Sequence, residues 1–338
     1  MRYPKVSVLM STYNGEKYIR EQIDSILCQV DVEIYLLIRD DGSRDNTTQI
    51  CTQYAQQYPN VEFYQGDNLG VGKSFLELLK KAPQADYYSF ADQDDVWLED
   101  KLIRAVEIIQ KCQFTSDSQD FIRCGESIIA SEKCDYQEGQ LGRMPILYAS
   151  NQQLVDEHLN NIGMRFNVEP KHGCLDTINR NKVSGCTMVM NNELRDIIRD
   201  ENRTPSEEVI SIRLHDTWSS IVANISGRLI YDEKARILYR QHGQNVVGGI
   251  EKKGISKLKD KMFKFKKKKN KGIRSKVAID IVNAYGDIID NKLVEQMKLF
   301  INCHSIKGAI ELCKNEEIVA SIGENKFMIF MRAVSGWI

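Results

Sequence analysis

The chain has 338 residues, of which 42% are hydrophobic and 28% are charged, and its formal net charge is −1 at pH 7. This composition is typical of globular proteins and excludes collagen-like, mucin-like and wholly disordered chains. The length predicts two domains, or one large domain with an appendage.

The first 112 residues alternate between strand and helix patterns. Short apolar runs predict strands at 6–10, 33–38, 61–64 and 87–91. Apolar residues at helical spacing predict helices at 16–29 and 98–112. A polar helix is expected at 45–58, ending before Pro59, and another helix at 75–81, ending before Pro83. Strands that alternate with helices form βαβ units, so we expect an α/β fold with a doubly wound, mainly parallel sheet flanked by helices.

The rest of the chain is less regular. Residues 113–182 show only loops and short elements. Beyond them we expect a strand at 183–190 followed by a helix from Asn191, a helix that begins at Thr217, and edge strands at 228–231 and 237–239. Helical patterns at 277–289, 293–300 and 306–312 follow. We therefore predict an α/β domain over 1–249 and a basic, helical C-terminal region over 250–338.

The charge is concentrated in one segment. Residues 251–276 contain 13 Lys and Arg and two acidic residues, a local charge of +11, so the other 312 residues carry −12. Such asymmetry predicts contact with an anionic partner. We expect an anionic membrane surface, with Phe263 and Phe265 adding apolar contact, and no nucleic acid. A solvated lysine loop is the alternative.

The nine cysteines form no CxxC pair and are irregularly spaced, so we expect no disulfide framework and a reducing compartment. The N-terminus does not have the pattern of a signal peptide, and no run of about 18 apolar residues predicts a membrane span. We expect a cytoplasmic protein that binds peripherally to the inner face of the membrane.

Polar clusters follow three of the predicted strands. STYNG (11–15) follows the first, DDGS (40–43) the second and DQDD (92–95) the fourth. The carboxyl ends of parallel strands meet at one edge, where α/β proteins bind ligands. Five carboxylates at that edge repel one another unless a cation lies among them, and oxygen ligands favour Mg²⁺ or Mn²⁺. In proteins, magnesium usually binds substrate phosphates as well as carboxylates, so a nucleoside diphosphate is the expected partner.

Each cluster alone has a simpler interpretation. DDGS is a good turn, and DQDD can be the charged N-terminus of a helix. Together with DDGSRDNT (40–47), NLGVGKSF (68–75) and ADQDDVW (91–97), however, STYNG resembles the family 2 glycosyltransferases of the GT-A fold. The later blocks SGCTMVMN, LHDTW and YRQHGQNVVG resemble a bacterial rhamnosyltransferase-like branch. The resemblance implies a nucleotide-sugar donor, a divalent cation and inversion at the anomeric carbon.

The resemblance also implies roles for residues on the nucleotide side of the site. Ser11 and Tyr13 would flank a uracil or thymine base, with Tyr13 stacking on it. Asp41 would accept the imide N–H of the base, although its neighbour Asp40 could exchange roles with it. Asp92 would bind the ribose.

The remaining roles concern the metal and the chemistry. Asp94 would be a metal ligand, with Asp95 supporting it by hydrogen bonds, and Asp216 in LHDTW would be the general base. Arg240 and His242 follow a predicted strand, and we expect Arg240 to bind the diphosphate and His242 to be a further metal ligand. A surface loop with a satisfied histidine is the alternative for these two.

The expected function is an inverting, metal-dependent transfer of a sugar to a hydroxyl of a polyprenyl-diphosphate-linked glycan in bacterial surface polysaccharide synthesis. The expected donor is dTDP-L-rhamnose, or otherwise a UDP-sugar. Two alternatives stay open. A nucleotidyltransferase or sugar-phosphate enzyme would need a basic, Gly-rich loop after the first strand, which STYNGEK lacks. A non-enzymatic binder of anionic polymers would use the lysine-rich segment.

Overall fold

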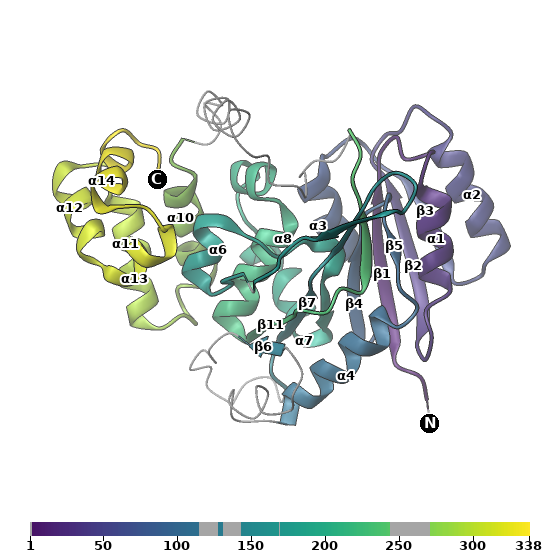
Figure 1. Cartoon of the computed structure of the whole chain (residues 1–338). Coiled ribbons are helices and arrows are strands. Elements are labelled where there is room, and N and C mark those ends of the chain that lie inside the picture. Colours follow the sequence, from purple (N-terminus) through teal and green to yellow (C-terminus); the bar gives the residue numbers. More distant parts are fainter. Residues whose placement is uncertain (1, 115–127, 131–142, 169, 244–270) are drawn as a thin grey trace.

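A computed structural model of the chain describes residues 2–114, 128–130, 143–168, 170–243 and 271–338. Its centre is an eight-stranded sheet in the order β3-β2-β1-β4-β10-β7-β11-β6 (Figure 1). The strands are β1 (Lys5–Thr12), β2 (Glu33–Asp40), β3 (Val61–Gln65), β4 (Tyr87–Ala91), β6 (Ile128–Ala130), β7 (Ile146–Ser150), β10 (Val189–Asn191) and β11 (Arg228–Asp232). The first four are parallel to one another, as are β7 and β11, whereas β10 and β6 run antiparallel to their neighbours.

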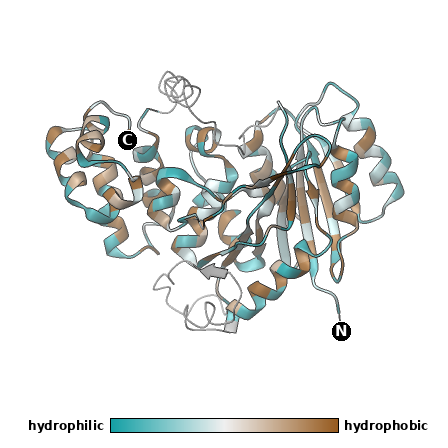
Figure 2. Cartoon of the chain, viewed as in Figure 1, coloured by the Kyte–Doolittle hydropathy of each residue, from teal (hydrophilic) through white to brown (hydrophobic). Residues whose placement is uncertain are grey.

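Helices cover both faces of this sheet because its strands are apolar on both sides (Figure 2). Along β1, Val8 and Met10 belong to the core on one face, and Leu9 belongs to the core on the other. The helices on the Val8 face are α1 (Ile19–Leu27), α2 (Thr47–Gln57) and α4 (Lys101–Phe114). Those on the Leu9 face are α3 (Val71–Lys81), α6 (Cys174–Arg180), α7 (Asn192–Ile198) and α8 (Glu207–Ser226).

A second, four-stranded sheet has the order β5-β12-β8-β9. Its strands are β5 (Val96–Trp97), β8 (Gln153–Val155), β9 (Asn161–Met164) and β12 (Ile237–Arg240). Leu238 of β12 pairs with Val96 and with Gln153, so this sheet joins the segment after β4 to two segments distant in the sequence.

Helices also form the C-terminal part of the chain, as α10 (Ile273–Tyr285), α11 (Asn291–Asn302), α12 (Ile306–Lys314), α13 (Glu316–Ile322) and α14 (Lys326–Val334). The N-caps of the last four are Asp290, Ser305, Asn315 and Asn325, whose side chains accept backbone N–H groups of the first turn. Such caps stabilise short helices by roughly 1 kcal/mol each. The core of these helices is continuous with the core on the Leu9 face.

The structure confirms the predicted α/β class, with its mainly parallel sheet and helical C-terminal region. The predicted boundary at 249/250 lies outside the described residues and stays a prediction. Within the described part of the chain, no helix is both long and apolar enough to cross a membrane.

Three local predictions differ from the structure. The segment predicted as one strand at 183–190 is a 3₁₀ turn, η1 (Gly185–Thr187), followed by the short β10. The turn forms where Gly185 meets His215, since a Cβ on Gly185 would lie 2.4 Å from the Nε2 atom of His215. The helix predicted from Thr217 begins earlier, at Glu207. The predicted edge strands β11 and β12 both have neighbours on two sides.

Candidate active site

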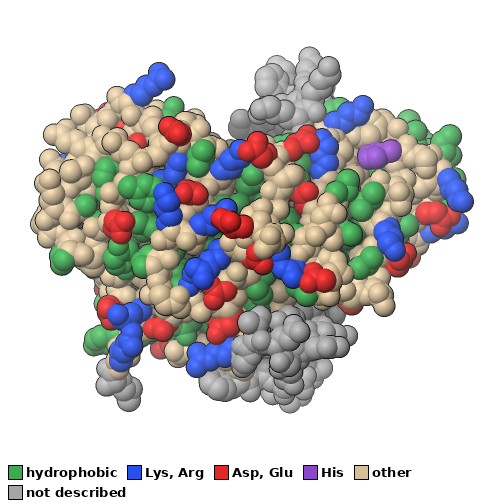
Figure 3. Space-filling model, turned by 180° about the vertical axis from the view of Figure 1, so that it is seen from behind, with side chains coloured by type: hydrophobic (Ala, Val, Ile, Leu, Met, Phe, Trp, Pro, Cys, Tyr) green, Lys and Arg blue, Asp and Glu red, His purple; other side chains and the backbone are tan. Residues whose placement is uncertain are grey.

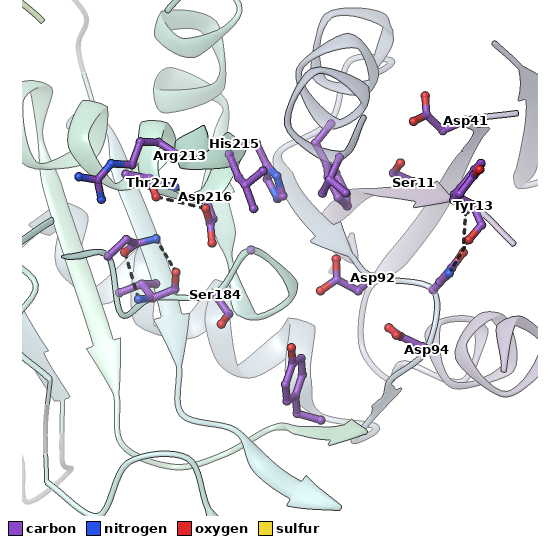
Figure 4. Close-up of a pocket in the computed structure, with 18 of the residues that line it drawn as sticks. Ser11, Tyr13, Asp41, Asp92, Asp94, Ser184, Arg213, His215, Asp216 and Thr217 are labelled. Atoms are coloured by element: carbon purple, nitrogen blue, oxygen red, sulfur yellow. Dashed lines mark hydrogen bonds between the residues drawn. The ribbon is translucent and has the colours of Figure 1, made fainter. Parts of the chain in front are cut away.

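A cavity of about 590 Å³ opens at the carboxyl edge of the large sheet (Figure 4). One side is lined by residues after β1, β2 and β4, and the other by residues of α8 and of the η1 turn. The structure brings seven residues that the sequence predicts for the site into this one lining: Ser11, Tyr13, Asp41, Asp92, Asp94, Asp216 and His242.

The loops after β1 and β4 are tied together at the mouth of the cavity. The backbone N–H of Tyr13 donates to Oε1 of Gln93 at 2.8 Å, and Nε2 of Gln93 donates back to the carbonyl of Tyr13 at 3.0 Å. Gly15 leaves room for this amide, because a Cβ there would lie 2.3 Å from the same Oε1 atom. The pairing fixes the backbone of Tyr13 while its side chain stays 46% exposed at the cavity. An aromatic face in this position can stack on a flat ring.

The structure separates the two adjacent carboxylates Asp40 and Asp41. Asp40 accepts backbone N–H groups from Gly42 and Ser43 and the hydroxyl of Thr12, so it holds the turn after β2. Asp41 lines the cavity instead. The geometry therefore favours Asp41 as the residue that faces a ligand.

Asp41 is held in place by an ion pair with Arg39, and both side chains are buried. The Asp41 carboxylate also accepts the backbone N–H of Leu69 at 2.8 Å and that of Gly70 at 2.9 Å. Arg39 donates to Oγ of Ser74 at 3.0 Å, and Ser74 in turn hydrogen-bonds Ser11 at 2.6 Å. One network thus orients Ser11 and Asp41.

The acidic residues after β4 strongly perturb one another. Burial and the charges of Asp94 and Asp216 raise the pKa of Asp92 to about 7. Burial and the charges of Asp94 and Asp92 raise the pKa of Asp95 well above its usual range. Oδ2 of Asp95 has no hydrogen-bond partner among the described residues. Asp92 lines the cavity, and a carboxylate with a strongly perturbed pKa in a cavity is typical of a functional site.

A histidine reaches this acidic cluster from a distant part of the sequence. Nε2 of His242 lies 2.7 Å from Oδ2 of Asp94, and both residues line the cavity. Asp92, Asp95 and Cys186 also converge, with one ligand atom of each within 4.8 Å of the others. Burial raises the pKa of the Cys186 thiol and keeps it protonated, so this trio does not suit Mg²⁺. The Asp94–His242 pair lies beside carboxylates whose negative charge is only partly offset by nearby positive charge. It therefore fits a divalent cation such as Mg²⁺ or Mn²⁺.

Arg240, expected at the diphosphate, is not in the cavity lining. Its side chain is buried, pairs with Glu21 and donates to the backbone carbonyls of Asp94 and Glu157. Arg240 is thus placed to hold the backbone at Asp94 rather than to meet a ligand directly.

Three other arginines line the cavity, namely Arg165, Arg180 and Arg213. Arg165 follows β9, and its guanidinium hydrogen-bonds Gln152 and Ser184. Its positive charge lowers the pKa of both Asp92 and Asp216, opposing the effect of burial. Arg165 lies in the stretch whose sequence shows no clear periodicity, and only the pairing of β8 and β9 brings it to the site.

Asp216 lies across the cavity from Asp92 and Asp94 (Figure 4). A kink inside α8 places it there, because Leu214 has φ +62° and ψ 171° and interrupts the helix. Such a conformation costs a residue with a side chain roughly 1–3 kcal/mol and is often found at functional sites. Oδ1 of Asp216 accepts the backbone N–H of Thr217 at 2.6 Å. Burial raises the pKa of Asp216 to about 6, so it can take up a proton near neutral pH.

Next to Asp216, His215 packs deep in the wall of the cavity. Its ring stacks on Phe75 at 4.0 Å between centroids and meets the edge of Phe90 at 4.8 Å. Burial lowers the pKa of His215 to about 3, so the ring is neutral at physiological pH. We therefore assign His215 a packing role beside the kink at Leu214.

The protein is thus of the α/β class, with carboxylates and arginines gathered in one cavity at the carboxyl edge of its sheet, an arrangement typical of enzymes that bind charged ligands. The model of glycosyl transferase family 2 matches residues 7–166. The dTDP-rhamnosyl transferase RfbG of Shigella flexneri is 30% identical over 297 residues, which cover 84% of this chain and 88% of RfbG. The chain therefore belongs to glycosyl transferase family 2 and is a glycosyltransferase.

The fold is also similar to that of solved structures. The crystal structure of S. aureus TarS 1–349 matches with a TM-score of 0.55 and 16% identity over 98% of this chain and 89% of that one. The same TarS fragment in complex with UDP-GlcNAc matches with a TM-score of 0.55 and 15% identity over the same shares. These likenesses support the GT-A fold that the sequence predicts.

The buried Arg39–Asp41 pair yields a stability prediction. Asp41→Asn removes the charge opposite a buried guanidinium, which should lower the free energy of unfolding by about 3 kcal/mol. The double variant Arg39→Met/Asp41→Asn removes both charges and should recover part of this loss. Urea unfolding of the three proteins measures the effect. An Asp41→Asn variant as stable as the wild type would show that the pair does not hold the loop.

Proposed function

We propose that the enzyme transfers a sugar from a nucleoside diphosphate donor to a hydroxyl of its acceptor, with inversion at the anomeric carbon. The position of Asp216 opposite the Asp92–Asp94 cluster carries this proposal, because it sets a candidate base across one cavity from a candidate diphosphate and metal site. Arg165 lines the same cavity and its charge acts on both Asp92 and Asp216, so it can attract a negatively charged donor.

We propose that the nucleotide binds with a pyrimidine base against Tyr13 and with its imide N–H toward Asp41. Gly70 donates to Oδ2 of Asp41 at 2.9 Å, and that oxygen can accept a further hydrogen bond. The ribose would then lie toward Asp92. The 30% identity to a dTDP-rhamnosyl transferase supports dTDP-L-rhamnose as the donor, with a UDP-sugar as the alternative.

Asp94 and His242 would hold a Mg²⁺ or Mn²⁺ ion. When bound, such an ion supplies Lewis-acid stabilisation of the charge that develops on the leaving diphosphate. The contribution of this chain is to hold those two ligands on a rigid base. Arg240 achieves this through its hydrogen bond to the carbonyl of Asp94, at 2.9 Å from Nε.

In the proposed reaction Asp216 acts as general base. The acceptor oxygen forms a bond to the anomeric carbon while its proton moves to the Asp216 carboxylate. The bond between that carbon and the donor phosphate oxygen breaks, and the nucleoside diphosphate leaves with the electron pair. A positioned base of this kind typically contributes about 10²–10⁴-fold to the rate.

The acceptor that we propose is a polyprenyl-diphosphate-linked glycan, met at the inner face of the bacterial membrane. Arg180 and Arg213 both line the cavity, Arg213 on the side that holds Asp216 (Figure 4), and they can attract an anionic acceptor. The predicted membrane contact of residues 251–276 lies mostly outside the described residues and stays a prediction.

The proposed donor site is tested by thermal unfolding with dTDP, UDP, GDP or ADP, each with Mn²⁺. A ligand that binds only the folded protein raises its melting temperature. We expect dTDP and UDP to raise it and the two purine nucleotides to have little effect. If GDP stabilises the protein most, the proposed base pocket is wrong. Metal-dependent hydrolysis of dTDP-L-rhamnose and of UDP-sugars then identifies the sugar.

The proposed base gives a pH prediction. A base works deprotonated, and the pKa of Asp216 is about 6, so kcat at saturating donor and metal should fall about tenfold per pH unit below that pH. Asp216→Asn should lower kcat by about 10²–10⁴-fold and abolish this limb. Calorimetry should show nucleoside diphosphate binding unchanged. Equal losses of donor affinity and rate would instead make Asp216 a donor ligand.

The proposed metal ligand is tested with Asp94→Asn. An amide cannot replace the charge of the carboxylate, so the Mn²⁺ concentration at half-maximal activity should rise by about tenfold or more. Asp31→Asn is the matched control, since this exposed carboxylate lies outside the cavity. Near-normal activity of Asp94→Asn at low Mn²⁺ would contradict the assignment.

A further inference from the structure

Helices α12 and α14 expose a group of large apolar side chains. Phe327 is 70% exposed and Ile306 is 65% exposed. The full group, which we name the α12–α14 face, is Ile306, Ile310, Phe327, Met328, Met331 and Val334. Over the surface seen from behind, acidic and basic side chains are mixed with exposed hydrophobic ones, and single exposed apolar residues need no explanation (Figure 3). A cluster on two packed helices is different.

The face is not an exposed edge of the core. Leu312 of α12 and Ile329 of α14 are fully buried, so each helix already has an inward apolar side. The two helices run in opposite directions, because His304 contacts the carbonyl of Ala333 at one end and Cys313 donates to the carbonyl of Lys326 at the other. On α12, Ile306 and Ile310 are four residues apart, and on α14, Phe327, Met331 and Val334 are four and three residues apart, spacings that keep them on one side of each helix.

The basic segment of the sequence enters the described structure beside this face. Residues 252–271 contain eleven lysines and one acidic residue. The last of these lysines, Lys271, lies against Gly336 just after α14, since a Cβ on Gly336 would be 2.8 Å from Cε of Lys271. The sequence thus carries dense positive charge up to Lys271, and that residue lies just after the end of α14, next to the apolar face. An anionic lipid surface suits positive charge beside an apolar face.

A second copy of the chain fits less well. The commonest symmetric dimer brings the same patch of both subunits together, so it would also bring together the two points, at Lys271, where the lysine-rich segments end. Like charges facing each other oppose such an interface. A bilayer presents negative headgroups above an apolar layer, and so it can satisfy the lysines and cover the apolar residues.

We propose that the α12–α14 face inserts into the headgroup region of an anionic bilayer, next to the point where the basic segment ends. The membrane contact itself does not depend on the proposed function. Its purpose does rest on that function, because the contact would bring the cavity to a lipid-linked acceptor. The contact has two separable parts. Lysines contribute a part that salt screens, and the apolar side chains contribute a part that salt does not weaken.

The test is co-sedimentation of the full chain with vesicles of anionic or only zwitterionic lipid, at low and high salt. Phe327→Ser/Met331→Ser and, separately, Ile306→Ser/Ile310→Ser remove apolar contact without touching the core. Each should weaken binding to anionic vesicles at high salt by about tenfold and leave the melting temperature unchanged. The matched control is Ile162→Ser/Val168→Ser, which changes two exposed apolar residues elsewhere and should bind as the wild type does.

Three results would overturn the proposal: no binding of the wild type to anionic vesicles, equal binding of wild type and both variants, or a change from dimer to monomer in the variants without a change in lipid binding. The last would assign the face to a second copy. Vesicle binding needs no donor, so this test is independent of the test of the proposed function. If dTDP stabilises the protein but the protein binds no vesicles, only the membrane inference is wrong.

Discussion

Mutual repulsion between carboxylates is the constraint around which this cavity is built. Asp92, Asp94 and Asp95 follow one strand, and Asp216 faces them from α8. Burial strengthens their repulsion and raises the pKa of Asp92 to about 7. The protein compensates only in part. Arg165 supplies positive charge from one side, and buried Lys101, whose pKa burial lowers to about 7, supplies less than a full charge from beneath. A site left acidic in this way suits the cation and the diphosphate that we propose for it.

Much of the remaining structure serves to keep these groups in place. Arg240, buried at the end of β12, donates to the carbonyl of Asp94, and Gln93 ties the β4 loop to the β1 loop. On the opposite wall, the left-handed backbone of Leu214 turns α8 so that Asp216 reaches the cavity. The cost of that conformation must be offset by packing, and His215 stacked on Phe75 beneath the kink is the most direct contributor.

The sequence predicts correctly that residues after β1, β2 and β4 meet in one lining, because this depends on local patterns. Strand periodicity fixes where β1, β2 and β4 end, and parallel strands bring Tyr13, Asp41 and Asp92 to one edge. The spacing of the residues alone could not distinguish Asp40 from Asp41, because the choice depends on which carboxylate accepts the backbone N–H of Gly42 in the turn. Arg165 was not predicted, because it reaches the cavity only through pairing of β8 with β9 and of β8 with β12. The same long-range contacts take Arg240 out of the cavity. The helices α13 and α14 were also not predicted, although their asparagine caps are visible in the sequence.

The central claim is that one cavity holds the donor between Tyr13 and Asp94 and offers its sugar to Asp216. A crystal structure of the chain with dTDP and Mn²⁺ tests it most directly, with anomalous scattering to locate the manganese. The account predicts thymine against Tyr13 and Asp41, and manganese in contact with Asp94 and the diphosphate. Nucleotide bound elsewhere, or manganese bound away from Asp94, would contradict it.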